Sequence, residues 1–117
     1  MVCRWTSGGP SEMARLDVYR NSGAQAEDVP YLLDVQAEVL SALDTRVVVP
    51  LRRRDRFPQV LTPPNLMPIV TVEGVACLLE TSKLAAVPLR ILKTPVASAA
   101  DHHVAITAAL NFLFQGF

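Results

Sequence analysis

Few side chains in this sequence have the types and spacing that catalysis or metal binding requires. His102 and His103 are adjacent, and neighbouring residues of a helix point about 100° apart, so the two rings do not converge on one ion. The spaced His, Asp or Glu partners that a zinc or iron site needs are missing. The sequence has no nucleophile elbow, and its five glycines are too scattered to form a phosphate-binding loop. Nothing here supports catalysis, a metal ion or a cofactor, and we predict none of them.

The densest charge cluster contains four arginines around one aspartate, Arg52, Arg53, Arg54, Asp55 and Arg56. Guanidinium groups suit both carboxylates and phosphates, so the cluster is either a solvated loop or a docking point for an acidic segment or an anion. It contains no interleaved aromatic residue and is a weak signal for nucleic-acid binding. The chain has 11 basic and 11 acidic residues, and this zero net charge attracts neither nucleic acid nor an anionic membrane and favours self-association.

The last three residues, Gln115-Gly116-Phe117, form a second candidate contact. A glycine after the last helical turn allows the chain to bend away from the helix axis. The phenylalanine that follows has two possible uses. It can fold back onto its own domain, or it can anchor in a pocket of another protein.

The cysteines, the N-terminal residues and the lack of a long apolar run predict where in the cell the protein is found. Cys3 and Cys77 form neither a metal site nor a redox motif, and we predict free thiols in a reducing cytosol. Met1 to Gly8 is interrupted by Arg4 and does not resemble a secretion signal. No uncharged run is long enough and free enough of proline to cross a bilayer. We therefore predict a soluble cytoplasmic protein.

The elements that position these residues belong to one domain. Residues 1–12 are rich in turn-forming residues and are predicted to be a flexible extension, with the domain at 13–117. Alternating or β-branched stretches predict strands at about 16–19, 31–36, 46–49, 69–72, 75–79 and 89–92, with Pro50 ending the third. Glu73-Gly74 is a two-residue hairpin turn. The predicted fold is α+β, a small β-barrel of about five mostly antiparallel strands followed by one C-terminal helix.

The terminal helix is too apolar to stand alone in water. Ser98 and Asp101 resemble a capping box at its start, and no charged residue follows Asp101. Ile106, Leu110 and Leu113 share one face, whereas Val104, Phe112 and Phe114 lie off it. We infer that a second apolar face of the helix meets another copy of the chain, giving a homodimer. The alternative is that loops of the same chain cover that face.

A series of short segments, in order and at matching spacing, resembles the CcdB family over about residues 14–117. Each segment alone is a weak signal. The resemblance to the family rests on their common order and spacing across roughly a hundred residues. The segments are Leu16-Asp17-Val18-Tyr19, Leu33-Asp34-Val35-Gln36, Val48-Val49-Pro50-Leu51, Met67-Pro68-Ile69-Val70, Leu79-Glu80-Thr81-Ser82, Ala86-Val87-Pro88 and Ala109-Leu110-Asn111-Phe112-Leu113-Phe114-Gln115-Gly116-Phe117.

This resemblance implies an SH3-like β-barrel with a terminal helix, forming a homodimer through a large apolar surface. Members of the family are non-catalytic bacterial toxins of plasmid-addiction systems. They bind the A subunit of DNA gyrase and trap the cleavage complex of this type II topoisomerase with DNA. A CcdA-like antitoxin neutralises them through a disordered C-terminal tail. We accordingly expect gyrase A, an antitoxin and a second copy as partners, and neither specific nucleic-acid binding nor a membrane.

The resemblance also implies contact residues. The family's gyrase contact is a Trp-Gly-Ile end after a phenylalanine, and here Phe114 and Gly116 match it, Phe117 replaces the apolar terminus and Gln115 stands in place of the tryptophan. Asn111 matches its family counterpart. A second gyrase contact corresponds to Val39, Leu40 and Ser41, where an acid usually replaces Ser41. Ile106, Leu110, Leu113 and Phe112 are expected to form the helix core or dimer contact. Arg52, Arg53, Arg54 and Arg56 are candidates for the antitoxin or anion contact.

Two other functions compete with gyrase poisoning. Gln115 is compatible with a degenerate homologue that binds an antitoxin and harms nothing, because glutamine lacks the aromatic face with which tryptophan stacks on arginine. An mRNA-cleaving toxin of the MazF type has a similar fold and also dimerises. That activity needs an acid–base pair or positioned cations, for which the Arg52–Arg56 loop is the sole candidate.

Overall fold

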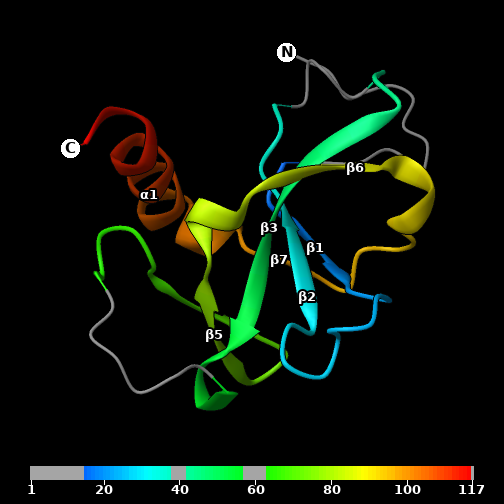
Figure 1. Ribbon diagram of the computed structural model, residues 1–117, viewed down its shortest axis with the longest axis horizontal. Coiled ribbons are helices and arrows are strands. Elements are labelled where there is room, and N and C mark those ends of the chain that lie inside the picture. Colours follow the sequence, from blue (N-terminus) through cyan, green and yellow to red (C-terminus); the bar gives the residue numbers. More distant parts are fainter. Residues whose placement is uncertain (1–14, 38–41, 57–62, 117) are drawn as a thin grey trace.

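The computed structural model describes residues 15–37, 42–56 and 63–116. Within these ranges, seven short strands form one antiparallel sheet that curls into a nearly closed barrel, and a single α-helix follows beside it (Figure 1). The order of the strands is β4-β5-β3-β2-β1-β7, with β6 paired to β3 outside that path. The elements are β1 Asp17–Arg20, β2 Tyr31–Asp34, β3 Thr45–Arg53, β4 Ile69–Val72, β5 Val75–Leu79, β6 Ala85–Pro88, β7 Ala97–Ser98 and α1 His103–Gln115.

The central strand β3 is shared by two neighbours along one edge. Its first half pairs with β6, from Thr45 opposite Pro88 to Val48 opposite Ala85. Its second half pairs with β5, from Leu51 opposite Leu79 to Arg53 opposite Cys77. The sequence-based prediction that Pro50 ends this strand was wrong. Pro50 lies where β3 passes from one neighbour to the other, and a missing N–H donor does least harm at such a point.

The β4–β5 hairpin confirms the strongest local prediction. Its two-residue turn is Glu73-Gly74, with φ of 52° and 79°, so both residues adopt the left-handed conformation that such hairpins require. The turn also helps to close the barrel, because Glu73 accepts hydrogen bonds from Tyr31 Oη at 2.6 Å and from Arg20 Nη2 at 3.1 Å. Residues from β1 and β2 are thereby tied to the tip of a distant hairpin.

Two other predictions fail at the C-terminal side. Residues 89–92 do not form a strand. Leu89–Ile91 is a 3-10 turn closed by the bond from the N–H of Leu92 to the carbonyl of Leu89, and β6 precedes it. The proposed cap at Ser98 serves a 3-10 turn at Ala100–His102, where Ser98 Oγ accepts the N–H of Ala100 at 3.2 Å. The helix α1 begins only after this turn.

Strands β1, β2 and β3 are buried on both faces. One face holds the main core with Val18, Leu33 and Val49, against which Ile106 and Ala109 of α1 pack. The other face holds a smaller apolar cluster around Tyr19, Val48 and Leu92. This double burial explains why the three strands show almost continuous apolar stretches rather than a strict alternation.

A buried ion pair joins β2 to β3. Arg46 and Asp34 are both fully buried, and Arg46 Nε and Nη2 donate to Asp34 Oδ2 at 2.9 and 2.7 Å. Gln36 continues the link beyond the end of β2, because its backbone N–H donates to Asp34 Oδ1 and its side-chain oxygen accepts the N–H of Val47. The pair therefore holds both strands in one register.

Tyr19 gives the fold a measurable pH dependence. Burial raises its pKa to about 12, and the nearby carboxylates of Asp17 and Asp34 add to the shift. An exposed tyrosine in the unfolded chain ionises near pH 10. The stability that the neutral phenol contributes is therefore complete below about pH 10 and is lost as the pH rises towards 12.

We predict that Tyr19→Phe removes part of this alkaline destabilisation. Between about pH 9 and about pH 11.5, urea unfolding of the wild type should lose about 2 kcal/mol more of unfolding free energy than the variant loses. Equal losses in the two proteins would show that Tyr19 does not titrate as a buried phenol.

Candidate functional site

The helix α1 is held by a narrow inner stripe and exposes most of its remaining surface. Ile106 and Ala109 are fully buried in the core. Three further predicted contact residues are half-buried, Leu110, Phe112 and Leu113. On the outer side, Val104 and Phe114 are each 70% exposed. Of the predicted helix contacts, Ile106 is thus a core residue, whereas the other three lie at the border between the core and the surface.

The end of α1 gathers the predicted gyrase-contact residues that the structure describes. Asn111, Phe114, Gln115 and Gly116 are all exposed over the last turn and a half. Gly116 has φ of 81°, and its N–H donates to the carbonyl of Phe112 at 2.9 Å. Any other residue would be strained in this left-handed conformation, although a Cβ at Gly116 would meet no atom within 4 Å. The glycine is therefore needed for the direction of the chain rather than for space.

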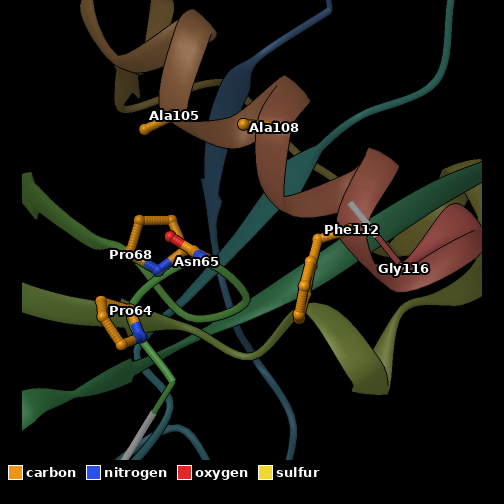
Figure 2. A pocket seen from close by; sticks show the side chains of 7 residues that line it. All are labelled: Pro64, Asn65, Pro68, Ala105, Ala108, Phe112 and Gly116. Carbon is orange, nitrogen blue, oxygen red and sulfur yellow. The ribbon is translucent and has the colours of Figure 1, made fainter.

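An apolar groove runs along the side of α1. Ala105, Ala108, Phe112 and Gly116 form one wall, and Pro64, Asn65 and Pro68 form the other. Its volume is about 440 Å³, and Figure 2 shows the Phe112 ring projecting from the helix, with Pro64, Asn65 and Pro68 on the opposite side of the groove. This groove was not predicted from the sequence. The sequence shows several prolines in residues 63–68. It does not show that this segment lies beside the helix, because that contact is made only by the tertiary fold.

Three of the four arginines in the charge cluster are already paired with carboxylates. Arg52 Nε lies 3.0 Å from the buried carboxylate of Glu80, and Arg56 Nη1 lies 3.0 Å from Asp28. Arg53 Nη2 lies 2.8 Å from Asp55, and this contact lowers the pKa of Asp55 and raises that of Arg53. Arg54 is exposed, and none of the ion pairs between described residues involves it. These pairs reduce the attraction of the cluster for an additional anion.

The other side chains that could do chemistry, the histidines and the cysteine, do not form a site in the described residues. His103 is exposed, with Nδ1 3.2 Å from the carbonyl of Ala100. Within 15–37, 42–56 and 63–116, no three His, Cys, Asp or Glu side chains gather as metal ligands would. Cys77 is a buried free thiol whose pKa burial raises to about 11, so it is a poor nucleophile.

Several predicted residues lie outside the described part of the chain. They are Val39, Leu40 and Ser41 of the second contact, Phe117, Cys3 and the extension at residues 1–12. In the part that the structure describes, no helix is long and apolar enough to cross a membrane.

Comparison with known proteins identifies the family. The model of the CcdB protein family matches residues 15–116, which is most of the chain. No curated protein matches the sequence. The chain therefore belongs to the CcdB family, the toxins of toxin–antitoxin systems, and residues 15–116 are its toxin domain.

Proposed function

We propose that this chain is a non-catalytic toxin that binds the A subunit of DNA gyrase through the end of α1 and traps the gyrase–DNA cleavage complex. The observation that carries the proposal is the joint exposure of Asn111, Phe114, Gln115 and Gly116 at one end of a helix whose other side is fixed in the core. A rigid helix that presents an aromatic ring and amide groups needs little ordering to bind, which favours affinity. Membership of the CcdB family supports gyrase as the target.

Each residue at the helix end has a different part in the proposed contact. Phe114, which is 70% exposed, supplies apolar area that becomes buried on binding. Asn111 and Gln115 supply amide donors and acceptors. Gln115 cannot stack on a guanidinium group as tryptophan does, but its amide oxygen can accept a hydrogen bond from one. Gly116 ends the helix in a left-handed conformation.

A second copy is the proposed partner of the exposed side of α1. Val104 remains largely exposed in the single chain, and Leu110 and Leu113 lie half-buried at the border of the core. Loops of the same chain do not cover Val104 or Phe114 in the part that the structure describes. Apolar surface of this kind marks an interface, and a two-fold dimer would bury it symmetrically.

The antitoxin is the third proposed partner, and the arginine cluster is its candidate contact. Because Arg52, Arg53 and Arg56 already hold carboxylates, an acidic segment would bind chiefly at Arg54 or would exchange with Asp55 and Asp28 at the surface. The same pairing weakens the case for a ribonuclease, since phosphate positioning would need these cations to be free.

We predict that gyrase binding depends on the last three residues. Calorimetric titration of the host gyrase A subunit should detect binding by the wild type, and deletion of Gln115-Gly116-Phe117 should weaken it by roughly 30-fold or more, as expected for a contact worth about 2 kcal/mol. Arg90→Ala, an exposed change far from the helix end, is the matched control and should leave affinity unchanged.

Two results would count against this prediction. Binding that survives the deletion would place the contact elsewhere on the domain. If the wild type fails to bind and Gln115→Trp binds, the chain is a degenerate homologue whose glutamine has removed the contact.

We further predict a dimer at micromolar concentration. Analytical ultracentrifugation should give twice the mass of one 12.8 kDa chain. Val104→Glu, at a position that is 70% exposed in the single chain, should shift the protein to the monomer while circular dichroism keeps its folded form. Thr94→Glu, at an exposed position outside α1, should remain dimeric. A monomeric wild type would refute the dimer.

A further inference from the structure

We propose that an extended acidic segment of the antitoxin binds in a cleft at the end of β3, and that one of its carboxylates replaces Asp55 on Arg53. Asp55 is then a built-in competitor, which lowers the affinity of the toxin for this segment. The choice of the antitoxin as the source of the segment rests on the proposed function. The cleft and the competition rest on the geometry of the chain itself.

The cleft lies between the end of β3 and the start of β5. Strand β3 ends at Arg53, which pairs with Cys77, and the chain then leaves the sheet in the 3-10 turn Arg54–Arg56. Strand β5 begins before that pair, so its first residues extend past the end of β3. The resulting arginine cleft has a volume of about 500 Å³ and is lined by Arg53, Arg54, Asp55, Gly74, Val75 and Ala76.

The arginine cleft already holds one carboxylate. Arg53 Nε donates to Asp55 Oδ1 at 3.0 Å, and Arg53 Nη2 donates to Asp55 Oδ2 at 2.8 Å. This two-point contact is the geometry in which a guanidinium group recognises a carboxylate. The side chains of Arg53 and Asp55 are 38% and 64% exposed, and exposed ion pairs of this kind are weak. A carboxylate from outside can therefore exchange with Asp55.

The rest of the lining suits an acidic segment with small apolar residues. Arg54 is exposed, and none of the ion pairs between residues of the described ranges involves it. Val75 is half-buried and Ala76 is exposed, so the surface beside the arginines is small and apolar. Once Asp55 is displaced, the lining carries two guanidinium groups and no carboxylate. An extended segment can lie along β5 where β3 has left it.

A nucleic acid fits the arginine cleft less well than a peptide does. Single-stranded nucleic acids bind where aromatic side chains stack on their bases, and the lining contains no aromatic residue. The chain also has no net positive charge to attract a polyanion. The charge of the cleft is local, which matches a few carboxylates rather than a long phosphate backbone.

The arginine cleft is separate from the proposed gyrase contact. In Figure 1 the end of β3 lies at the bottom of the view, whereas α1 lies at the upper left. A short segment bound in the cleft therefore leaves the end of α1 uncovered. The cleft would anchor the antitoxin, and other parts of the antitoxin would have to block gyrase.

The first test uses a fluorescein-labelled peptide of ten residues in which glutamate alternates with valine or alanine. Fluorescence anisotropy at low salt should show that Asp55→Asn binds this probe about two- to fivefold more tightly than the wild type, because the substitution frees Arg53. Loss of structure or of a direct contact would weaken binding instead. Asp44→Asn makes the same change of net charge at an exposed position before the start of β3, and should leave the affinity unchanged.

The two arginines give the complementary result. Arg53→Gln and Arg54→Gln should each weaken binding of the probe by about two- to fivefold, and Arg90→Gln, an exposed change outside the cleft, should not. In the Arg53→Gln background, Asp55→Asn should no longer tighten binding, because the two substitutions act on one interaction. The proposal is overturned if Asp55→Asn does not tighten binding, or if Asp44→Asn tightens it equally.

The second test separates the possible partners. The host's CcdA-like antitoxin should displace the probe, and an antitoxin that leaves it bound would overturn the assignment of the segment. A single-stranded RNA of ten nucleotides that binds more tightly than the probe, and responds to the same substitutions, would overturn the choice of a peptide.

Titration of gyrase A with the same proteins tells the two proposals apart. If the probe binds and responds to Asp55→Asn but the toxin does not bind gyrase, the arginine cleft holds and the proposed function fails. If the toxin binds gyrase but the probe shows no response to Asp55→Asn, the cleft fails and the proposed function stands.

Discussion

The buried pair of Arg46 and Asp34 is the interaction on which the rest of this structure depends. Two opposite charges without exposure to solvent are costly unless each is well bonded, and removal of one partner typically costs about 3–5 kcal/mol. Burial raises the pKa of Asp34, whereas the hydrogen bonds from Arg46 and from the N–H of Gln36 oppose that shift. A slip of one residue between β2 and β3 would place the guanidinium against apolar side chains. The pair therefore excludes other registers of the central strands.

The position of β3 determines where its neighbouring strands and the helix α1 lie. Its two halves receive β6 and β5, and its inner face joins the core in which Ile106 and Ala109 of α1 are buried. The helix is thus held along a narrow stripe, which leaves its outer side and its end available for partners. A single helix in this way serves both the fold and the proposed recognition of gyrase.

Local patterns predicted the elements whose determinants are local. The Glu73-Gly74 turn and the apolar stripe of the final helix can be recognised because hairpins and helices are specified by neighbouring residues. The strand assigned to residues 89–92 failed because β6 is selected by pairing with Thr45–Val48, some 40 positions away. The groove escaped prediction for the same reason. Its two walls come from segments about 40 residues apart, and nothing local to either segment indicates the other.

The types of the last three residues already indicated a contact with another protein, but gyrase as the target and the other contact residues followed from the family resemblance. A helix end with an exposed Phe114 is unremarkable in isolation, and Gln115 departs from the family's tryptophan. Structure adds that the described residues of this set are all exposed at the end of α1. It also explains why the arginine cluster, the most conspicuous feature of the sequence, is a weaker candidate, because most of its charge is already matched by carboxylates.

The most direct measurement of the central claim is the amount of cleaved DNA trapped by gyrase in the presence of the purified toxin. Supercoiled plasmid, gyrase and ATP are incubated with the wild type or with Gly116→Arg, and the complexes are then denatured to release linear DNA. Our account predicts linear DNA with the wild type and none with the folded variant, because the variant cannot maintain the left-handed turn that directs the tail. No linear DNA with the wild type, under conditions in which a gyrase-poisoning drug produces it, would contradict the account.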